Sequence, residues 1–277
     1  MNRGTERAWK AATLLVLMLS VAAAAFYSWQ SRDVSGPVKE SQVEIEPLLP
    51  SICRFAIHEG EGFITCTVDP REFRIELALT DAGGPAHGSL AAYLGAMAAT
   101  GSMPVIAMNG GMYHPDMRPV GLHVEQGREI APLETADGEG NFYLKPNGVF
   151  FIGNDGEAHV METQAFAAAG IRPRLATQSG PMLVIGGALH PRFLPDGSSR
   201  FIRNGVGVRA DGMVVLAISR DPVSLGLFAR AFRDGFGCPD ALFLDGGISA
   251  FAAKGELVIG GKDPAGPILA VFGPQGG

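Results

Sequence analysis

Polar residues followed by glycine come directly after short apolar runs at three places in the chain. The three segments are Asn109-Gly110-Gly111, Gln178-Ser179-Gly180 and Asp245-Gly246-Gly247. Short apolar runs predict buried strands, so each polar side chain is expected at a strand end. A strand end holds a side chain rigidly, and glycine lets a ligand approach backbone N–H groups. Together the segments predict one shared site in which Asp245 is a fixed carboxylate.

Two arginines, Arg200 and Arg203, precede a further apolar strand. A guanidinium group can hold a phosphate or carboxylate with two parallel hydrogen bonds, so the arginines predict an anion-binding element. The catalytic candidates are Asp245, Asn109 and Arg203. The candidates for substrate binding are Gly110, Gly111, Gln178, Ser179, Gly180, Arg200, Gly246, Gly247 and Ser249.

Common catalytic signatures are missing from the sequence. It contains no Gly-x-Ser-x-Gly, His-Glu-x-x-His, Cys-x-x-Cys or P-loop motif, and its six histidines lack metal-ligand spacing. The sequence therefore identifies no metal ligands, and the candidate residues named above do not require a cofactor. A divalent cation held by oxygen atoms of Asp245 and Asn109, with Asp116 or His114, is an open alternative.

The N-terminal region predicts export. Basic residues between positions 3 and 10 precede an uncharged, mostly apolar stretch over 11–30. This pattern is typical of a signal peptide, and the stretch is also long enough to remain as an anchor in the inner membrane. We expect residues 1–30 to be one or the other, 31–50 a polar linker, and 51–277 the catalytic domain. The protein is then periplasmic or extracellular, with membrane contact only if residues 1–30 stay attached.

Composition and cysteine content agree with an exported globular protein. The 277 residues are 47% hydrophobic and 18% charged, and the net charge of −6 offers no electrostatic footprint for nucleic acid. Cys53 and Cys66 flank a predicted hairpin turn; pairing would suit an oxidising compartment, and the sequence leaves it open. Cys238 is expected to be an unpaired, buried small side chain.

The spacing of apolar residues predicts few helices and many short strands. Helices are expected over 89–101, capped by Ser89, and from Asp221, with Pro222 in the first helical position. Glycine-containing turns separate the remaining apolar runs, including hairpins over 149–161 and 206–218. The expected fold is α+β, a single domain with a large mixed or antiparallel sheet of short strands and a few flanking helices.

Five segments, taken in order, resemble the phosphodiester glycosidase family. They are "AMNGGMYHPDMRPVGLHVEQG", "LKPNGVFFIGNDG", "ATQSGPMLVIGG", "RNGVGVRADGMVVLAIS" and "DALFLDGGISAFA". The resemblance covers roughly residues 52–272. It implies a glycan or sugar-phosphodiester substrate and points to the candidate residues named above, apart from Arg200. Ile248 and Ala250 stand where family members often have small residues or serine, and Asp245 and Ser249 match.

This resemblance implies hydrolysis of the glycosidic C–O bond of a sugar-1-phosphodiester. Arg203 and glycine N–H groups would bind the phosphate, and Asp245 would attack the anomeric carbon or activate water. Asn109 and Gln178 would contact sugar hydroxyls or orient water. Two alternatives stay open: a metal-assisted phosphodiesterase that cuts a P–O bond, and a non-catalytic module that binds anionic polysaccharide.

Overall fold

A computed structural model describes residues 46–80 and 84–274. The expected signal peptide or anchor over 1–30 and most of the 31–50 linker lie outside the described residues. Three helices and two short helical turns are present in the described part. They are η1 (Glu46–Leu48), α3 (Leu90–Thr100), α4 (Thr163–Ala169), α5 (Leu225–Arg230) and η2 (Ala231–Gly235). None of the helices in these ranges is long and apolar enough to cross a membrane.

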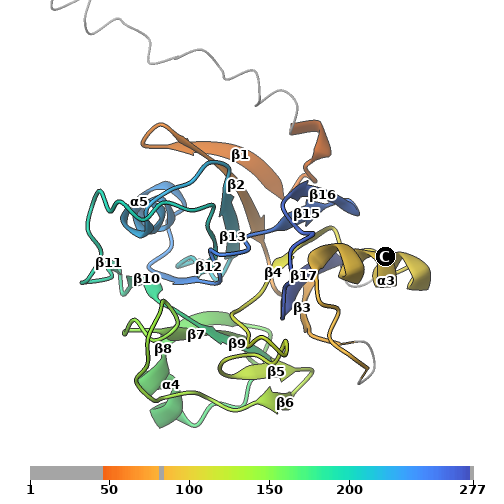
Figure 1. Ribbon diagram of the computed structural model, residues 1–277, viewed down its shortest axis with the longest axis horizontal. Coiled ribbons are helices and arrows are strands. Elements are labelled where there is room, and N and C mark those ends of the chain that lie inside the picture. Colours follow the sequence, from red (N-terminus) through yellow and green to blue (C-terminus); the bar gives the residue numbers. More distant parts are fainter. Residues whose placement is uncertain (1–45, 81–83, 275–277) are drawn as a thin grey trace, which may run out of the picture. The chain divides into compact units, whose positions relative to one another are not determined.

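The strands form three sheets rather than one large sheet, and every strand pair in the described part is antiparallel (Figure 1). Sheet A has the order β1 (Cys53–His58), β2 (Glu61–Val68), β13 (Val214–Ser219), β12 (Asn204–Val208), β14 (Asp240–Phe243), β10 (Met182–Ile185) and β11 (Ala188–Leu189). Sheet B has the order β16 (Glu256–Ile259), β15 (Phe251–Ala253), β4 (Ile106–Asn109), β17 (Ile268–Pro274) and β3 (Phe73–Ala78). Sheet C has the order β6 (Arg128–Ala131), β5 (His123–Glu125), β9 (Leu175–Ser179), β7 (Gly148–Ile152) and β8 (Ala158–Glu162). The α+β class with short strands is confirmed.

A common apolar core joins the three sheets. Its buried members include Leu216 and Leu242 from sheet A, Leu269 from sheet B, and Phe150 and Leu175 from sheet C. Separate apolar clusters pack α5 and η2 on sheet A, α3 on sheet B and α4 on sheet C. Figure 1 shows α3, α4 and α5 beside these sheets. The inner strands β4, β7 and β13 are therefore buried along their whole length, which explains why they read as apolar runs rather than as alternating patterns.

Helix α3 begins and ends as its sequence predicts. The Ser89 hydroxyl accepts a hydrogen bond from Ala92 N, and Gly101 ends the helix in a left-handed conformation at φ 71°. The hairpins β7–β8 and β12–β13 also form at the predicted positions.

Helix α5 starts later than the sequence predicts. Ser224, not Asp221, caps it, and its hydroxyl accepts from Leu227 N. Pro222 stays outside the helix because Val223 pairs in an antiparallel bridge with Phe201 and is held there by two backbone hydrogen bonds. The Val223 carbonyl, which accepts one of these two bonds from Phe201 N, accepts a second from Arg203 Nε at 2.8 Å.

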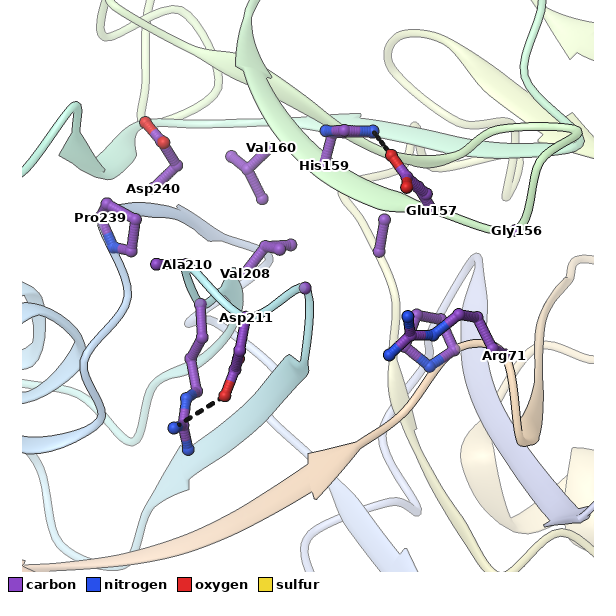
Figure 2. A pocket seen from close by; sticks show the side chains of 14 residues that line it. Arg71, Gly156, Glu157, His159, Val160, Val208, Ala210, Asp211, Pro239 and Asp240 are labelled. Carbon is purple, nitrogen blue, oxygen red and sulfur yellow. Dashed lines mark ion pairs between the residues drawn. The ribbon is translucent and has the colours of Figure 1, made fainter.

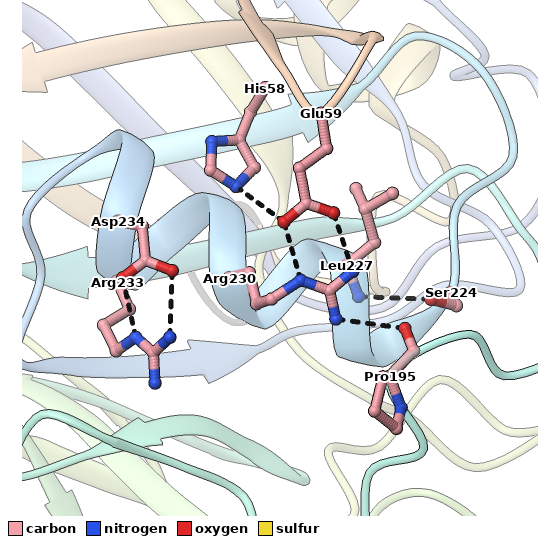
Figure 3. Close-up of polar contacts among 8 residues, drawn as sticks. All are labelled: His58, Glu59, Pro195, Ser224, Leu227, Arg230, Arg233 and Asp234. Atoms are coloured by element: carbon pink, nitrogen blue, oxygen red, sulfur yellow. Dashed lines mark hydrogen bonds and ion pairs between the residues drawn. The ribbon is translucent and has the colours of Figure 1, made fainter.

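Glycine brings α5 and η2 close to β12. A Cβ atom on Gly205 would lie 2.8 Å from Leu242 O and 3.2 Å from the rings of Phe228 and Phe232. Ion pairs also hold the end of α5, as Figure 3 shows. There Arg230 donates to both carboxylate oxygens of Glu59 at the β1–β2 turn, each at 2.7 Å. The start of β12, where Arg203 and Asn204 lie, is therefore firmly packed.

Cys53 and Cys66 are cross-strand neighbours in the β1–β2 hairpin and form a disulfide. Cys238 is free and buried, and burial raises the pKa of its thiol to about 12. An unreactive thiol follows, because the thiolate is the nucleophilic form.

We expect no reaction of the native protein with Ellman's reagent, and one thiol after unfolding without reductant. Reduction before unfolding should raise the number of reactive thiols to three. It should also lower the free energy of unfolding by about 3 kcal/mol, as for other disulfide-closed loops of similar length. Two or more reactive thiols in the unreduced, unfolded protein would show that the hairpin is not cross-linked.

Candidate active site

Strand ends from all three sheets meet at one place. Strand β4 of sheet B ends at Asn109, β9 of sheet C ends at Ser179, and β12 of sheet A begins at Asn204; all three side chains are buried. The Ser179 hydroxyl donates to the carbonyl of Leu244 at 2.6 Å, directly before Asp245. The structure thus brings together three of the segments that the sequence singled out, those around positions 109, 179 and 245.

The carboxamides of Asn109 and Asn204 form a reciprocal pair at the centre of this convergence. Asn204 Nδ2 donates to the carbonyl and to Oδ1 of Asn109, at 2.8 and 2.9 Å. Asn109 Nδ2 in turn lies 3.4 Å from Asn204 Oδ1. Sequence reasoning did not select Asn204. The signal it could have used is a carboxamide residue between Arg203 and an apolar strand rich in glycine.

The same two side chains hold the loop that carries Asp245. Asn109 donates to the carbonyl of Asp245 at 3.2 Å and accepts from Ala250 N at 2.9 Å. Asn204 Oδ1 accepts from the N–H of Asp245 at 3.3 Å. The Ser249 hydroxyl lies 2.8 Å from the carbonyl of Asp245 and 3.2 Å from Asn204 Oδ1. The backbone of the loop is therefore fixed on both sides of Asp245.

The Asp245 carboxylate itself has few partners. One oxygen accepts from Gly247 N at 3.1 Å, and no ion pair of Asp245 exists among the described residues. Burial raises the pKa of Asp245 above the ordinary aspartate range, and the Gly247 hydrogen bond opposes that shift. The Tyr113 phenol lies close enough for the Asp245 charge to raise its pKa, after the larger effect of burial. Tyr113 is a second residue of this region that sequence reasoning missed.

Arg203 is a buried cation without a carboxylate partner in the described part of the chain. Only 1% of the residue is exposed, and its guanidinium lies near the rings of Phe201 and Phe243, at 5.5 and 5.4 Å from their centroids. Nε donates to the carbonyl of Val223 at 2.8 Å, and Nη2 donates to that of Ser199 at 3.0 Å. Desolvation lowers the pKa of Arg203 to about 10.

The remaining nitrogen of Arg203, Nη1, faces the Asp245 loop. A Cβ atom built on Gly246 would lie 3.2 Å from this nitrogen and 2.6 Å from the Phe243 ring. A glycine is thus needed at 246 for the loop to lie against the guanidinium. The neighbouring Gly247 is exposed, and a side chain there would meet only ordinary contacts.

Two of the residues predicted to bind substrate have side chains committed elsewhere. Gln178 Oε1 accepts from Leu122 N and Glu134 N, and Nε2 donates to the Glu134 carbonyl and lies 3.3 Å from Thr163 Oγ1. These bonds use the full capacity of the carboxamide, so it anchors the backbone at Leu122 and at Glu134. Arg200 is exposed and pairs with Glu61 at 2.6 Å. Neither side chain joins the group around Asp245.

The other predicted glycines serve close packing of the chain. A Cβ atom on Gly110 would lie 2.8 Å from Leu269 N, and one on Gly111 would lie 2.7 Å from Thr177 Oγ1. One on Gly180 would lie 2.5 Å from the carbonyl of Phe142. Close packing of the chain therefore accounts for glycine at each of these positions. The sequence predicted instead that these glycines would let a substrate approach the backbone.

A cleft of about 380 Å³ lies at the opposite end of β14 from Asp245, lined by Asp240 and Arg209 among others (Figure 2). Its charged groups are largely paired within the protein. Arg209 pairs with Asp211 at 3.0 Å, and Asp240 accepts from Gly186 N. Such a cleft offers less unpaired charge than the surroundings of Arg203.

Residues 46–80 and 84–274 contain no group of three or more His, Cys, Asp or Glu placed to hold a metal ion. Asp116, one of the suggested ligands, pairs with Arg118 at 2.7 Å.

Comparison with known proteins identifies the class to which this fold and site belong. Residues 102–267 match the phosphodiester glycosidase family. The uncharacterized protein YigE of Escherichia coli (strain K12) is 35% identical over 192 residues, which are 69% of this chain and 74% of YigE. The chain therefore belongs to the phosphodiester glycosidase family and is a hydrolase of the glycosidase type.

Solved structures share the fold. The catalytic domain of zebrafish N-acetylglucosamine-1-phosphodiester alpha-N-acetylglucosaminidase, auto-inhibited by its pro-peptide, matches with a TM-score of 0.58 and 14% identity over 79% of this chain and 81% of that one. A hypothetical protein from Synechocystis matches with a TM-score of 0.52 and 15% identity over 80% of this chain and 61% of that one.

The reciprocal carboxamide pair leads to a prediction about stability. We expect Asn204→Ala to lower the free energy of unfolding by about 3 kcal/mol or more, because it leaves several buried donors and acceptors without partners. Asn154 is a matched control, since it is exposed and makes one hydrogen bond, to the Arg172 carbonyl. Asn154→Ala should cost less than about 1 kcal/mol. Denaturant unfolding measures both, and equal losses would contradict a central role for Asn204.

Proposed function

We propose that this enzyme cleaves the bond between the anomeric carbon and the phosphate oxygen of a sugar-1-phosphodiester. Water enters, the C–O bond breaks, and the products are a free sugar and a phosphomonoester. One observation carries the proposal. A buried guanidinium without a carboxylate partner lies against the glycine loop that carries Asp245, a half-buried carboxylate without a cation. An anionic group and an electron-poor carbon in one substrate would match both.

Arg203 is suited to the phosphate. Two of its nitrogens are held by the carbonyls of Val223 and Ser199, so the plane of the guanidinium is fixed before substrate binds. Its Nη1 is left to face a ligand beside Gly246. A preorganised charge in a site with little water stabilises the negative charge that grows on the leaving phosphate.

Asp245 is suited to the anomeric carbon. A phosphate leaving group is a weak base and needs little help from a general acid, so one carboxylate can serve the reaction. Attack by Asp245 on carbon would give retention of configuration, and activation of water by Asp245 would give inversion. The configuration of the first sugar released therefore assigns its role. Asn109 and Ser249 act by positioning the Asp245 loop.

Export and an envelope or exopolysaccharide substrate belong to the same proposal. A basic segment followed by an apolar stretch at the N-terminus supports export. The Cys53–Cys66 disulfide suits an oxidising compartment.

Replacement of the two charged groups tests the proposed site. We expect Asp245→Asn to lower kcat/KM on a sugar-1-phosphodiester by about 10²–10⁴-fold, the usual contribution of a catalytic base or acid. Arg203→Lys should lower it by about 10²-fold or more, because lysine cannot keep both carbonyl contacts and reach the phosphate. Arg200→Gln is the matched control, and its activity should stay within about twofold of the wild type. A folded, fully active Asp245→Asn protein would overturn the assignment.

The shifted pKa values predict the pH profile. Asp245 must be ionised, and its pKa is raised, so kcat/KM should fall on the acid side at a pH above the ordinary aspartate value of about 3.9. Arg203 must be charged, and its pKa is lowered to about 10, so a second loss should begin near that pH. Measurement of kcat/KM across this range tests both limbs. Undiminished activity at pH 3.5 would contradict the role of Asp245.

A further inference from the structure

A cavity of about 210 Å³ adjoins Arg203 on the side facing residues 192–199. Its wall includes Arg192, Phe193, Leu194, Ser199 and Leu225, together with Arg203 itself. The volume is below the range of about 300–1,000 Å³ that holds drug-sized ligands, so a compact group fits. Because Arg203 also lies against Gly246, one side chain borders both the cavity and the Asp245 loop.

The charge in this cavity has one sign. No aspartate or glutamate lines it, and within the described ranges neither Arg192 nor Arg203 pairs with a carboxylate. Asp196, the acidic residue of the same loop, is not part of the wall, and its charge contributes to the raised pKa of Arg230. By contrast, the cleft in Figure 2 contains Glu157, Asp211 and Asp240. The cavity beside Arg203 is therefore complementary to an anion.

The rest of the wall is mainly apolar, and apolar side chains extend beyond it. Leu194, in the wall, is 71% exposed, and Phe201, whose ring lies near the Arg203 guanidinium, is 52% exposed. Besides the two arginines, the polar side chains of the wall are Ser198 and Ser199, so a group with many hydroxyls would find few hydrogen-bond partners. Exposed apolar side chains beside a ligand cavity indicate contact with an apolar group.

We propose that this cavity binds the leaving half of the substrate, and that the leaving alcohol is apolar next to the phosphate. The phosphate lies at Arg203 and Arg192, and the first carbons of an alkyl or prenyl chain lie against Phe193, Leu194 and Leu225. Of the two substrates proposed above, this favours an envelope sugar-1-phosphate ester of an apolar alcohol over an exopolysaccharide in which the phosphate links two sugars. This inference rests on the proposed function and narrows it to one kind of aglycone.

Three substrates with the same sugar and different aglycones test the inference. Methyl, hexyl and glucosyl phosphodiesters are hydrolysed at concentrations below micelle formation, and release of free sugar is measured. We expect the wild type to prefer the hexyl over the methyl compound by tenfold or more in kcat/KM, and to prefer the hexyl over the glucosyl compound. Equal rates on all three, or a preference for the glucosyl compound, would overturn the inference.

Variants in the cavity test where the preference arises. Gly197 borders the cavity, its backbone is compatible with a side chain, and an added Cβ would meet only contacts of 3.8 Å or more. Gly197→Leu should therefore fill the space and lower the hexyl-to-methyl ratio about tenfold. Leu194→Ser should lower that ratio in the same direction. Ile57→Ser removes a leucine-sized side chain that is 63% exposed on β1, and it should leave the ratio unchanged.

The outcomes separate this inference from the proposed function. If the wild type releases sugar from none of the three compounds, the proposed function fails. If it releases sugar from all three and the cavity variants leave the hexyl-to-methyl ratio unchanged, only the aglycone site is wrong.

Discussion

The reciprocal hydrogen bonds between Asn109 and Asn204 are the constraint on which the site depends. They join the end of β4 in sheet B to the start of β12 in sheet A, in a region from which side chains exclude water. Their remaining capacity goes to the backbone of the loop that carries Asp245. Buried carboxamides of this kind stabilise the folded state only when all their hydrogen-bond partners are present. The pair therefore specifies one arrangement of the two sheets and the Asp245 loop.

This arrangement places a guanidinium and a carboxylate on the two sides of Gly246 without pairing them. Arg203 is held by carbonyls and Asp245 by a single glycine N–H, and no ion pair joins them among the described residues. Burial of each charge lowers the stability of the folded protein, and the shifts of the two pKa values express that cost. A substrate with an anionic phosphate next to an electrophilic carbon would relieve both. The proposed reaction would therefore explain why the protein keeps these two charges away from water.

Several parts of the fold and the site could be predicted from the sequence. The helix after Ser89, the glycine-linked hairpins and the convergence at Asn109 and Asp245 follow from local patterns that the tertiary structure preserves. Along β9, successive side chains point to opposite faces. Thr177 and Ser179 therefore donate to the carbonyls of Gly110 and Leu244 near the site, and Gln178 must point away. A polar run in a strand does not reveal which face the site occupies. The late start of α5 and the pairing of Arg200 with Glu61 depend on contacts between distant segments, which no local pattern encodes.

The bond that breaks can be identified directly by hydrolysis in H₂¹⁸O. Release of free sugar alone does not decide it, because water could attack either the anomeric carbon or the phosphorus. Oxygen on a phosphomonoester does not exchange with solvent under these conditions, so mass spectrometry of that product reads the site of attack. Attack at carbon by water or by Asp245 predicts a phosphomonoester without ¹⁸O. A phosphomonoester carrying one ¹⁸O would contradict it and would show that the P–O bond is cut.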